Sequence, residues 1–192
     1  MPQKTAKPIA TEMKPNLSVA IINRPSLWHL WFVFVVLALL AWPAKLAAQE
    51  SGIAVGTKAP AAKVQTLDGK STDLASYIGK TPVLIEFWAF WCPNCKEMEP
   101  ALLSLQKKYG SRVKFLGVAV SVNQSRDRVK AYTRKHRYRH ETVFDNDGQA
   151  TEAYDVPATS YVVVVDAKGN VVYTGLGGKQ DLEAAIRKAL KG

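Results

Sequence analysis

The feature that most restricts the fold is a pair of cysteines between a strand pattern and a helix pattern. Residues 81–90 (TPVLIEFWAF) form a continuous apolar run rich in β-branched and aromatic residues, which is typical of a buried central strand. Cys92 and Cys95 follow almost directly, and Pro93 stands where a helix can begin. Apolar residues at helical spacing then lead to a glycine stop at Gly110. The sequence therefore predicts a strand, a dithiol and a helix in that order.

The chemistry of the two cysteines is predicted from their spacing. They are the only cysteines of the 192-residue chain, and a disulfide between them closes almost no loop, so it would stabilise the fold little. Cys92 is predicted at a helix N-terminus, where unpaired N–H groups and the helix dipole stabilise a thiolate. Cys95 lies about one turn further along and can close the disulfide. We expect this pair to exchange disulfides with other molecules, with Pro93 and Asn94 setting its redox potential.

Two N-terminal segments are predicted to stay outside the folded domain. Residues 1–26 form a polar, proline-containing, net basic leader, and Leu27–Trp42 is an apolar run of 16 residues. That length falls between the core of a signal peptide, about 7–15 residues, and a membrane span of about 20. Residues 27–48 are therefore interpreted either as a signal peptide, with a cleavage site near Ala47 and Ala48, or as an uncleaved anchor.

The charge distribution predicts where the chain lies. Basic residues before the apolar run favour a cytoplasmic N-terminus, with the remainder at the outer face of the cytoplasmic membrane or in the periplasm. A dithiol there is not kept reduced by the glutathione pool. The formal net charge of +10 suits an acidic partner or an anionic membrane surface. The scattered basic residues do not indicate nucleic acid.

Residues 52–191 are predicted to form one α/β domain. It begins with a short hairpin around the turn Asp68-Gly69. Later strands are predicted at residues 113–122, 141–148 with its turn, 160–166 and 171–175, and helices at residues 93–110, 125–138, 149–156 and 181–192.

The stretch VLIEFWAFWCPNCKEMEP resembles the active-site region of thioredoxin-fold proteins, and VGTKAP with TLDGKSTDLASYIGKTPVLIEFW resembles the leader of the membrane-tethered TlpA/ResA-like branch. The resemblance covers residues 52–190. It implies a thioredoxin fold, which is a central mixed sheet flanked by helices, here with an N-terminal hairpin extension. It also implies a thiol–disulfide oxidoreductase that needs no bound cofactor and reduces protein disulfides, such as those of apocytochrome c. An electron-donating membrane protein would regenerate its dithiol.

The resemblance also assigns roles to individual residues. Cys92 matches the exposed attacking thiolate, and Cys95 matches the buried resolving thiol. Glu86, six residues before Cys92, matches a buried acid that relays a proton to or from the second cysteine. Trp91 matches the aromatic residue packed beside the dithiol, and Pro100 matches a proline that kinks the helix.

Glu86 carries an independent argument from the residues around it. A lone carboxylate within VLIEFW is costly to bury, and burial raises the pKa of a carboxyl group into the range useful for proton transfer near neutral pH. The alternative is a glutamate that faces solvent at the edge of the sheet.

One position departs from the family pattern. The family places a cis-proline opposite the dithiol, before the third core strand, and the spacing of flanking residues puts Ser160 there. Either Ser160 replaces the proline, so that the Thr159–Ser160 bond can be trans, or Pro157 is the cis-proline in a shifted loop. Thr159 and Ser160 are therefore predicted to shape the substrate-binding loop.

Two other functions could use the same cysteines. A copper or haem chaperone would use the same thiolates but needs a further ligand, and the nearby Met98 fits the apolar helix stripe instead. A peroxide reductase needs a threonine and an arginine around its cysteine, and FWAFWCPNC has neither. His136 and His140 are four residues apart but lack a third ligand, so they are interpreted as part of a solvated basic helix end.

Overall fold

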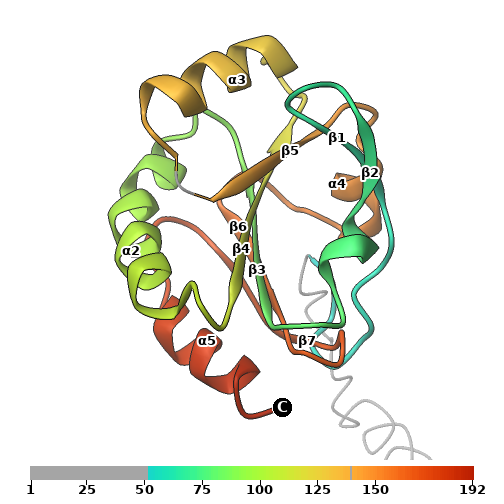
Figure 1. Cartoon of the computed structure of the whole chain (residues 1–192), viewed down its shortest axis with the longest axis vertical. Coiled ribbons are helices and arrows are strands. Elements are labelled where there is room, and N and C mark those ends of the chain that lie inside the picture. Colours follow the sequence, from blue (N-terminus) through green and yellow to red (C-terminus); the bar gives the residue numbers. More distant parts are fainter. Residues whose placement is uncertain (1–51, 139) are drawn as a thin grey trace, which may run out of the picture. The chain divides into compact units, whose positions relative to one another are not determined.

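The computed structural model describes residues 52–138 and 140–192 (Figure 1). The predicted leader (1–26) and apolar segment (27–48) lie outside the described residues. Within the described ranges, no helix is both long enough and apolar enough to cross a membrane.

One mixed sheet of seven strands organises the described part of the chain. The strands are β1 (Lys63–Thr66), β2 (Ser71–Asp73), β3 (Val83–Trp88), β4 (Lys114–Val120), β5 (Glu141–Asp145), β6 (Tyr161–Val165) and β7 (Val171–Leu176). Their order across the sheet is β2-β1-β5-β4-β3-β6-β7. β3, β4 and β5 run parallel, whereas β1–β2, β1–β5, β3–β6 and β6–β7 are antiparallel pairs. The predicted mixed sheet is confirmed.

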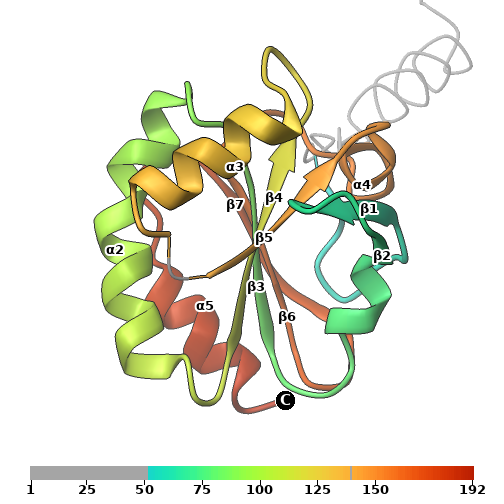
Figure 2. The ribbon, with the colours of Figure 1, turned by 45° about the horizontal axis from the view of Figure 1, so that its top comes forward.

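Helices cover both faces of the sheet. They are the 3-10 helix η1 (Leu74–Tyr77), α2 (Pro93–Tyr109), α3 (Arg126–Lys135), α4 (Gln149–Ala153) and α5 (Leu182–Ala189). Figure 2 shows α2, α3 and α5 on one side of the sheet and α4 on the other. The buried apolar residues form two clusters, and the neighbours Leu84 and Ile85 of β3 enter different ones. This follows because successive side chains of a strand point to opposite faces.

β3 is the central strand of the site. All six of its residues are buried, because β4 and β6 flank it and helices cover both faces. The prediction of a buried strand from the apolar run is confirmed. A polar side chain on β3 therefore has no access to bulk water.

The elements around β3 follow the predicted order, although several of their bounds differ from the prediction. β1 and β2 form the expected hairpin around the Asp68-Gly69 turn, but η1, which the sequence patterns did not predict, follows it. α3 begins after the expected cap Ser125 but ends at Lys135 rather than near Tyr138. The chain leaves the helix there because Arg137 adopts the left-handed region, with φ of 52°.

Candidate active site

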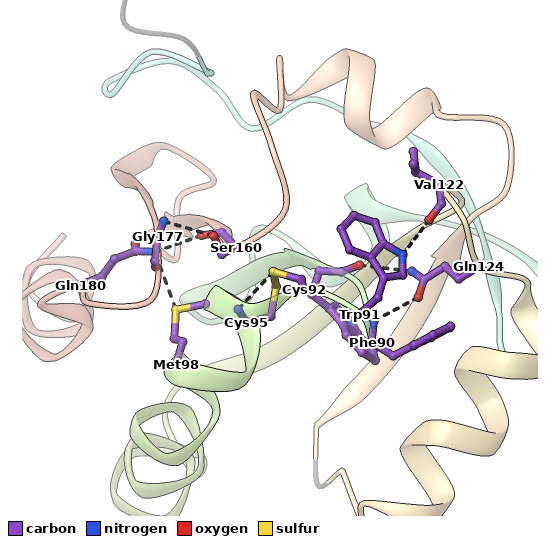
Figure 3. Close-up of a disulfide and its surroundings, with 11 residues drawn as sticks. Phe90, Trp91, Cys92, Cys95, Met98, Val122, Gln124, Ser160, Gly177 and Gln180 are labelled. Atoms are coloured by element: carbon purple, nitrogen blue, oxygen red, sulfur yellow. Dashed lines mark hydrogen bonds between the residues drawn. A yellow bond between two sulfur atoms is a disulfide. The ribbon is translucent and has the colours of Figure 1, made fainter.

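The two cysteines form a disulfide across the first turn of α2 (Figure 3). Cys92 is the N-cap residue of the helix, and Pro93 is its first residue. The backbone N–H of Cys95 donates a hydrogen bond to Sγ of Cys92, with a distance of 3.1 Å. Unpaired N–H groups and the helix dipole at this end favour negative charge. The geometry therefore suits Cys92 to become a thiolate when the disulfide opens.

The expected exposure of Cys92 is wrong for the disulfide form. Cys92 and Cys95 are each only 2% exposed, whereas Trp91, Pro93 and Asn94 around them are exposed. Cys92 is covered because its side chain turns back over the helix end to bond with Cys95 and to accept the N–H hydrogen bond. Trp91, Pro93 and Asn94 therefore form an exposed rim around the disulfide. A partner thiol must pass this rim before it can attack a sulfur atom.

The loop after β4 holds the rim in place. The indole Nε1–H of Trp91 donates to the carbonyl of Val122 at 3.0 Å (Figure 3). The buried Gln124 accepts from the backbone N–H of Phe90 at 3.1 Å and donates to the carbonyl of Val120 at 2.6 Å. Sequence reasoning missed Gln124, because a lone glutamine between a strand and a helix gives no pattern.

Glu86 is buried in the middle of the sheet. It is 2% exposed, and neither carboxylate oxygen has a hydrogen-bond partner among the described residues. Burial, with a further contribution from the charge of Glu99, raises the pKa of Glu86 to about 8. The alternative of a solvent-facing glutamate at a sheet edge is therefore wrong. Glu86 lies on the same sheet face as Leu84, which packs in the cluster formed with α2.

The position opposite the dithiol is occupied by Ser160 in a trans backbone. No cis peptide bond occurs among the described residues, so the interpretation of Pro157 as a cis-proline is wrong. Ser160 is fully buried with φ of 71°, and its N–H donates to the carbonyl of Phe87 at 2.9 Å. Thr159, beside it, is half-buried. The backbone N–H of Ser160 is thus engaged within the fold.

Gln180 ties the Ser160 loop to the rest of the site. Its side-chain amide donates to the carbonyl of Ser160 at 3.1 Å and to that of Gly177 at 2.6 Å, and it lies 3.7 Å from Sδ of Met98 (Figure 3). Met98 is 1% exposed, as expected for a core residue of the α2 stripe. Gln180 was also missed, because only the folded chain brings it close to α2.

The two histidines occupy different environments. His136 stacks on Tyr132 with ring centroids 4.0 Å apart, whereas burial lowers the pKa of His140 to about 4. Among residues 52–138 and 140–192, no group of three or more His, Cys, Asp or Glu side chains is placed to hold a metal ion.

The chain is similar to known proteins in both sequence and structure. Residues 54–190 match the Redoxin family. The chain is 30% identical over 141 residues to the thioredoxin-like protein YneN of Bacillus subtilis. The aligned region covers 72% of this chain and 82% of that protein. The chain is also 30% identical over 125 residues to the thiol-disulfide oxidoreductase ResA of Bacillus subtilis. That alignment covers 65% of this chain and 69% of ResA.

Solved structures show the same fold. A thioredoxin-family thiol:disulfide interchange protein of Chlorobium tepidum superposes with a TM-score of 0.60 and 28% identity, over 72% of this chain and 99% of that chain. The thioredoxin domain of a thiol-disulfide oxidoreductase of Bacteroides vulgatus superposes with a TM-score of 0.59 and 24% identity, over 72% of this chain and 97% of that chain. With a redox-active cysteine pair at the start of α2, the chain belongs to the Redoxin family of the thioredoxin superfamily and is a ResA-like thiol–disulfide oxidoreductase.

Proposed function

We propose that this oxidoreductase reduces selected disulfides of other proteins outside the cytoplasm. The observation that carries the proposal is the hydrogen bond from the Cys95 N–H to Sγ of Cys92 at the start of α2. In the reduced chain the same N–H stabilises a Cys92 thiolate, and the thiolate is the form that attacks a disulfide. Similarity to ResA, a thiol-disulfide oxidoreductase, supports disulfide exchange as the reaction.

The reaction proceeds through a mixed disulfide. The Cys92 thiolate attacks one sulfur of the substrate disulfide, and the other substrate sulfur leaves as a thiolate that takes a proton from water. Cys95 then loses its proton to a neighbouring base and attacks Sγ of Cys92, so that the second substrate sulfur leaves as a thiolate and takes a proton from water. The substrate gains two electrons, and the chain ends with the Cys92–Cys95 disulfide.

Glu86 is proposed to accept the proton of Cys95. A carboxyl group transfers protons most effectively when its pKa lies near the working pH, and the pKa of about 8 meets this condition. An ordinary surface glutamate would be ionised at neutral pH and would return a proton poorly. Trp91, Pro93 and Asn94 would form the rim that receives the substrate, and the loop of Thr159 and the buried Ser160 would border it from the position opposite the dithiol.

The location and partners belong to the same proposal. The apolar segment 27–42 would hold the chain at the outer face of the membrane or direct its export. A membrane protein that donates electrons would restore the dithiol after each turnover. Apocytochrome c, whose haem-binding cysteines must be reduced, is the substrate class that we would test first.

The test is to trap the substrate on the chain. A Cys95→Ser chain cannot resolve the mixed disulfide, so partner proteins should accumulate on Cys92 in the producing cells and be released by reductant. A chain with both Cys92→Ser and Cys95→Ser is the matched control and should trap nothing. If the single variant traps no more than the control, the proposal fails.

The direction of electron flow needs a second measurement. Alkylation of the wild-type chain in intact cells should find Cys92 and Cys95 mostly as thiols, because a reductant is held in its reduced form. A chain found mostly as the disulfide would indicate an oxidant instead.

A further inference from the structure

Buried polar atoms without a partner gather on the sheet face that carries Glu86. They are both carboxylate oxygens of Glu86, Nε1 of Trp88, Nε2 of His140 and Oγ1 of Thr142, and none has a hydrogen-bond partner within the described residues. Buried polar groups are nearly always hydrogen-bonded, so a cluster of this kind calls for an explanation.

Gly117 of β4 lies at the centre of this cluster. It is paired with Glu86 of β3 on one side and with Thr142 of β5 on the other. Paired residues of neighbouring strands point to the same face, and the strands lie about 4.8 Å apart. Because Gly117 has no side chain, other side chains can occupy the space over it, between Glu86 and Thr142.

Two ring nitrogens fill the space above Gly117. A Cβ atom at Gly117 would lie 2.8 Å from Nε1 of Trp88 and 3.2 Å from Nε2 of His140. Both nitrogens therefore lie over Gly117, the residue that pairs with Glu86 on the neighbouring strand. A side chain larger than hydrogen at residue 117 would displace them.

The two nitrogens offer opposite hydrogen-bonding roles. An indole N–H can only donate, whereas a neutral imidazole has one donor and one acceptor nitrogen. An N–H on Nε2 of His140 would add a second donor over Gly117 and leave a protonated Glu86 without a nitrogen acceptor, so the lone pair is assigned to Nε2. The lowered pKa of His140 keeps the imidazole neutral at physiological pH, which agrees with this assignment.

These roles match the two protonation states of Glu86. An ionised carboxylate only accepts hydrogen bonds, and Trp88 and Thr142 supply donors. A protonated carboxyl group must donate one hydrogen bond, and the cluster offers two acceptors, Nε2 of His140 and the hydroxyl oxygen of Thr142, of which the imidazole nitrogen is the stronger base. The other titratable groups around Glu86 are Glu99 of α2, whose charge helps to raise the pKa of Glu86, and Tyr138 before β5, whose own pKa a Glu86 carboxylate helps to raise.

We propose that His140 is a positioning residue for proton transfer: it accepts the hydrogen bond of protonated Glu86 and so sets the pH at which Glu86 can take the proton of Cys95. This inference rests on the proposed role of Glu86. The proton moves from the Cys95 thiol to a Glu86 oxygen, and the new O–H donates to Nε2 of His140. When the dithiol is restored, Glu86 returns the proton to Cys95, and His140 stays neutral throughout.

The direct test is the titration of Glu86 in the purified, reduced full-length chain. Carbon-13 NMR of labelled glutamate carboxyls follows it, with Glu86→Gln identifying its signal. His140→Phe removes the acceptor but fills the space, so it should lower the titration midpoint of Glu86 by about one pH unit, as expected for the loss of one hydrogen bond to the neutral form. His140→Gln keeps an acceptor oxygen and should stay near the wild-type midpoint. His136→Phe changes the other histidine of this region and should have no effect.

An unchanged midpoint, or one that rises, in His140→Phe overturns the inference. If that variant does not fold, His140→Leu takes its place with the same expectation. The rate of exchange with oxidised glutathione, measured against pH, separates the two proposals. If Glu86→Gln leaves this profile unchanged, the role of Glu86 fails. If Glu86→Gln changes it but His140→Phe does not, only the inference about His140 fails.

A double variant completes the test. His140 is proposed to act through Glu86, so His140→Phe should not alter the exchange profile further in a Glu86→Gln chain. A separate, additive effect of His140→Phe would mean that the histidine acts by another route, and it would also overturn the inference.

Discussion

Replacement of Glu86 by glutamine should change how the stability of the fold depends on pH. The pKa of Glu86 is raised from 4.5 to about 8 in the folded chain, mainly by burial. The folded state therefore holds this proton more tightly than the unfolded chain does. Tighter binding of this proton adds to the free energy of unfolding. The full contribution is present below about pH 4.5, and it is lost as the pH rises through about 8. Glutamine has nearly the same shape but does not ionise, so this loss should disappear.

The size of the effect follows from the two pKa values. They differ by about 3.5 pH units, and each unit is worth about 1.4 kcal/mol, so the total is about 5 kcal/mol. Of this total, about 2 kcal/mol is lost between pH 6.5 and pH 9. His140, whose folded pKa is about 4 and whose ordinary value is 6.5, titrates in the unfolded chain at the low end of this range. It does so equally in the wild type and in Glu86→Gln, so its contribution cancels in the comparison.

The assay is urea unfolding of the oxidised chain at several pH values between 6.5 and 9. The disulfide keeps Cys92 and Cys95 from titrating in this range. The free energy of unfolding of the wild type should fall by about 2 kcal/mol relative to that of Glu86→Gln, and a surface change, Glu152→Gln, should follow the wild type. If the difference between wild type and Glu86→Gln stays constant with pH, the carboxyl group does not carry the raised pKa, and the reasoning is refuted.

Three further substitutions test the packing around the site, each by urea unfolding. Gly117→Ala should lower the free energy of unfolding by about 1–3 kcal/mol, because its Cβ would lie 2.8 Å from Nε1 of Trp88; an unchanged stability would mean that the indole moves freely. Gln124→Ala should cost about 1–3 kcal/mol by leaving buried backbone groups unpaired, and amide hydrogen exchange should quicken at Phe90, so an unaltered exchange rate there would contradict the role of the glutamine. Ser160→Pro should cost about 3 kcal/mol, because proline fits neither φ of 71° nor the N–H hydrogen bond to β3; a proline variant as stable as Ser160→Gly would show that the loop rearranges readily.

The path from strand to dithiol to helix was predictable because its signals are local. A continuous apolar run can satisfy its backbone only in the interior of a sheet, and the run at β3 is buried throughout. The helix signals were also local, since Pro93 begins α2 and Gly110 caps its end. The position of Cys92 at the helix end followed from these two elements without knowledge of the rest of the chain.

The surroundings of the dithiol were less predictable because they depend on contacts between distant segments. Gln124 and Gln180 bind backbone groups near β3 and α2 from loops far along the sequence. The burial of Cys92 depends on the orientation of its side chain at the start of α2, where Sγ accepts the hydrogen bond of the Cys95 N–H. No pattern within a short window of sequence reports such contacts.

The sequence by itself determined that a buried strand delivers two thiols to the start of a helix, because hydrophobic periodicity and helix-end residues act over a few neighbouring positions. Only the tertiary structure decided that Glu86 is buried and that Ser160 lies opposite the disulfide with a trans peptide bond. It also decided that Nε2 of His140 and Nε1 of Trp88 both lie close to Gly117. Those features arise where β3, β4 and β5 are placed side by side, and strand pairing joins residues whose separation in sequence carries no local signal.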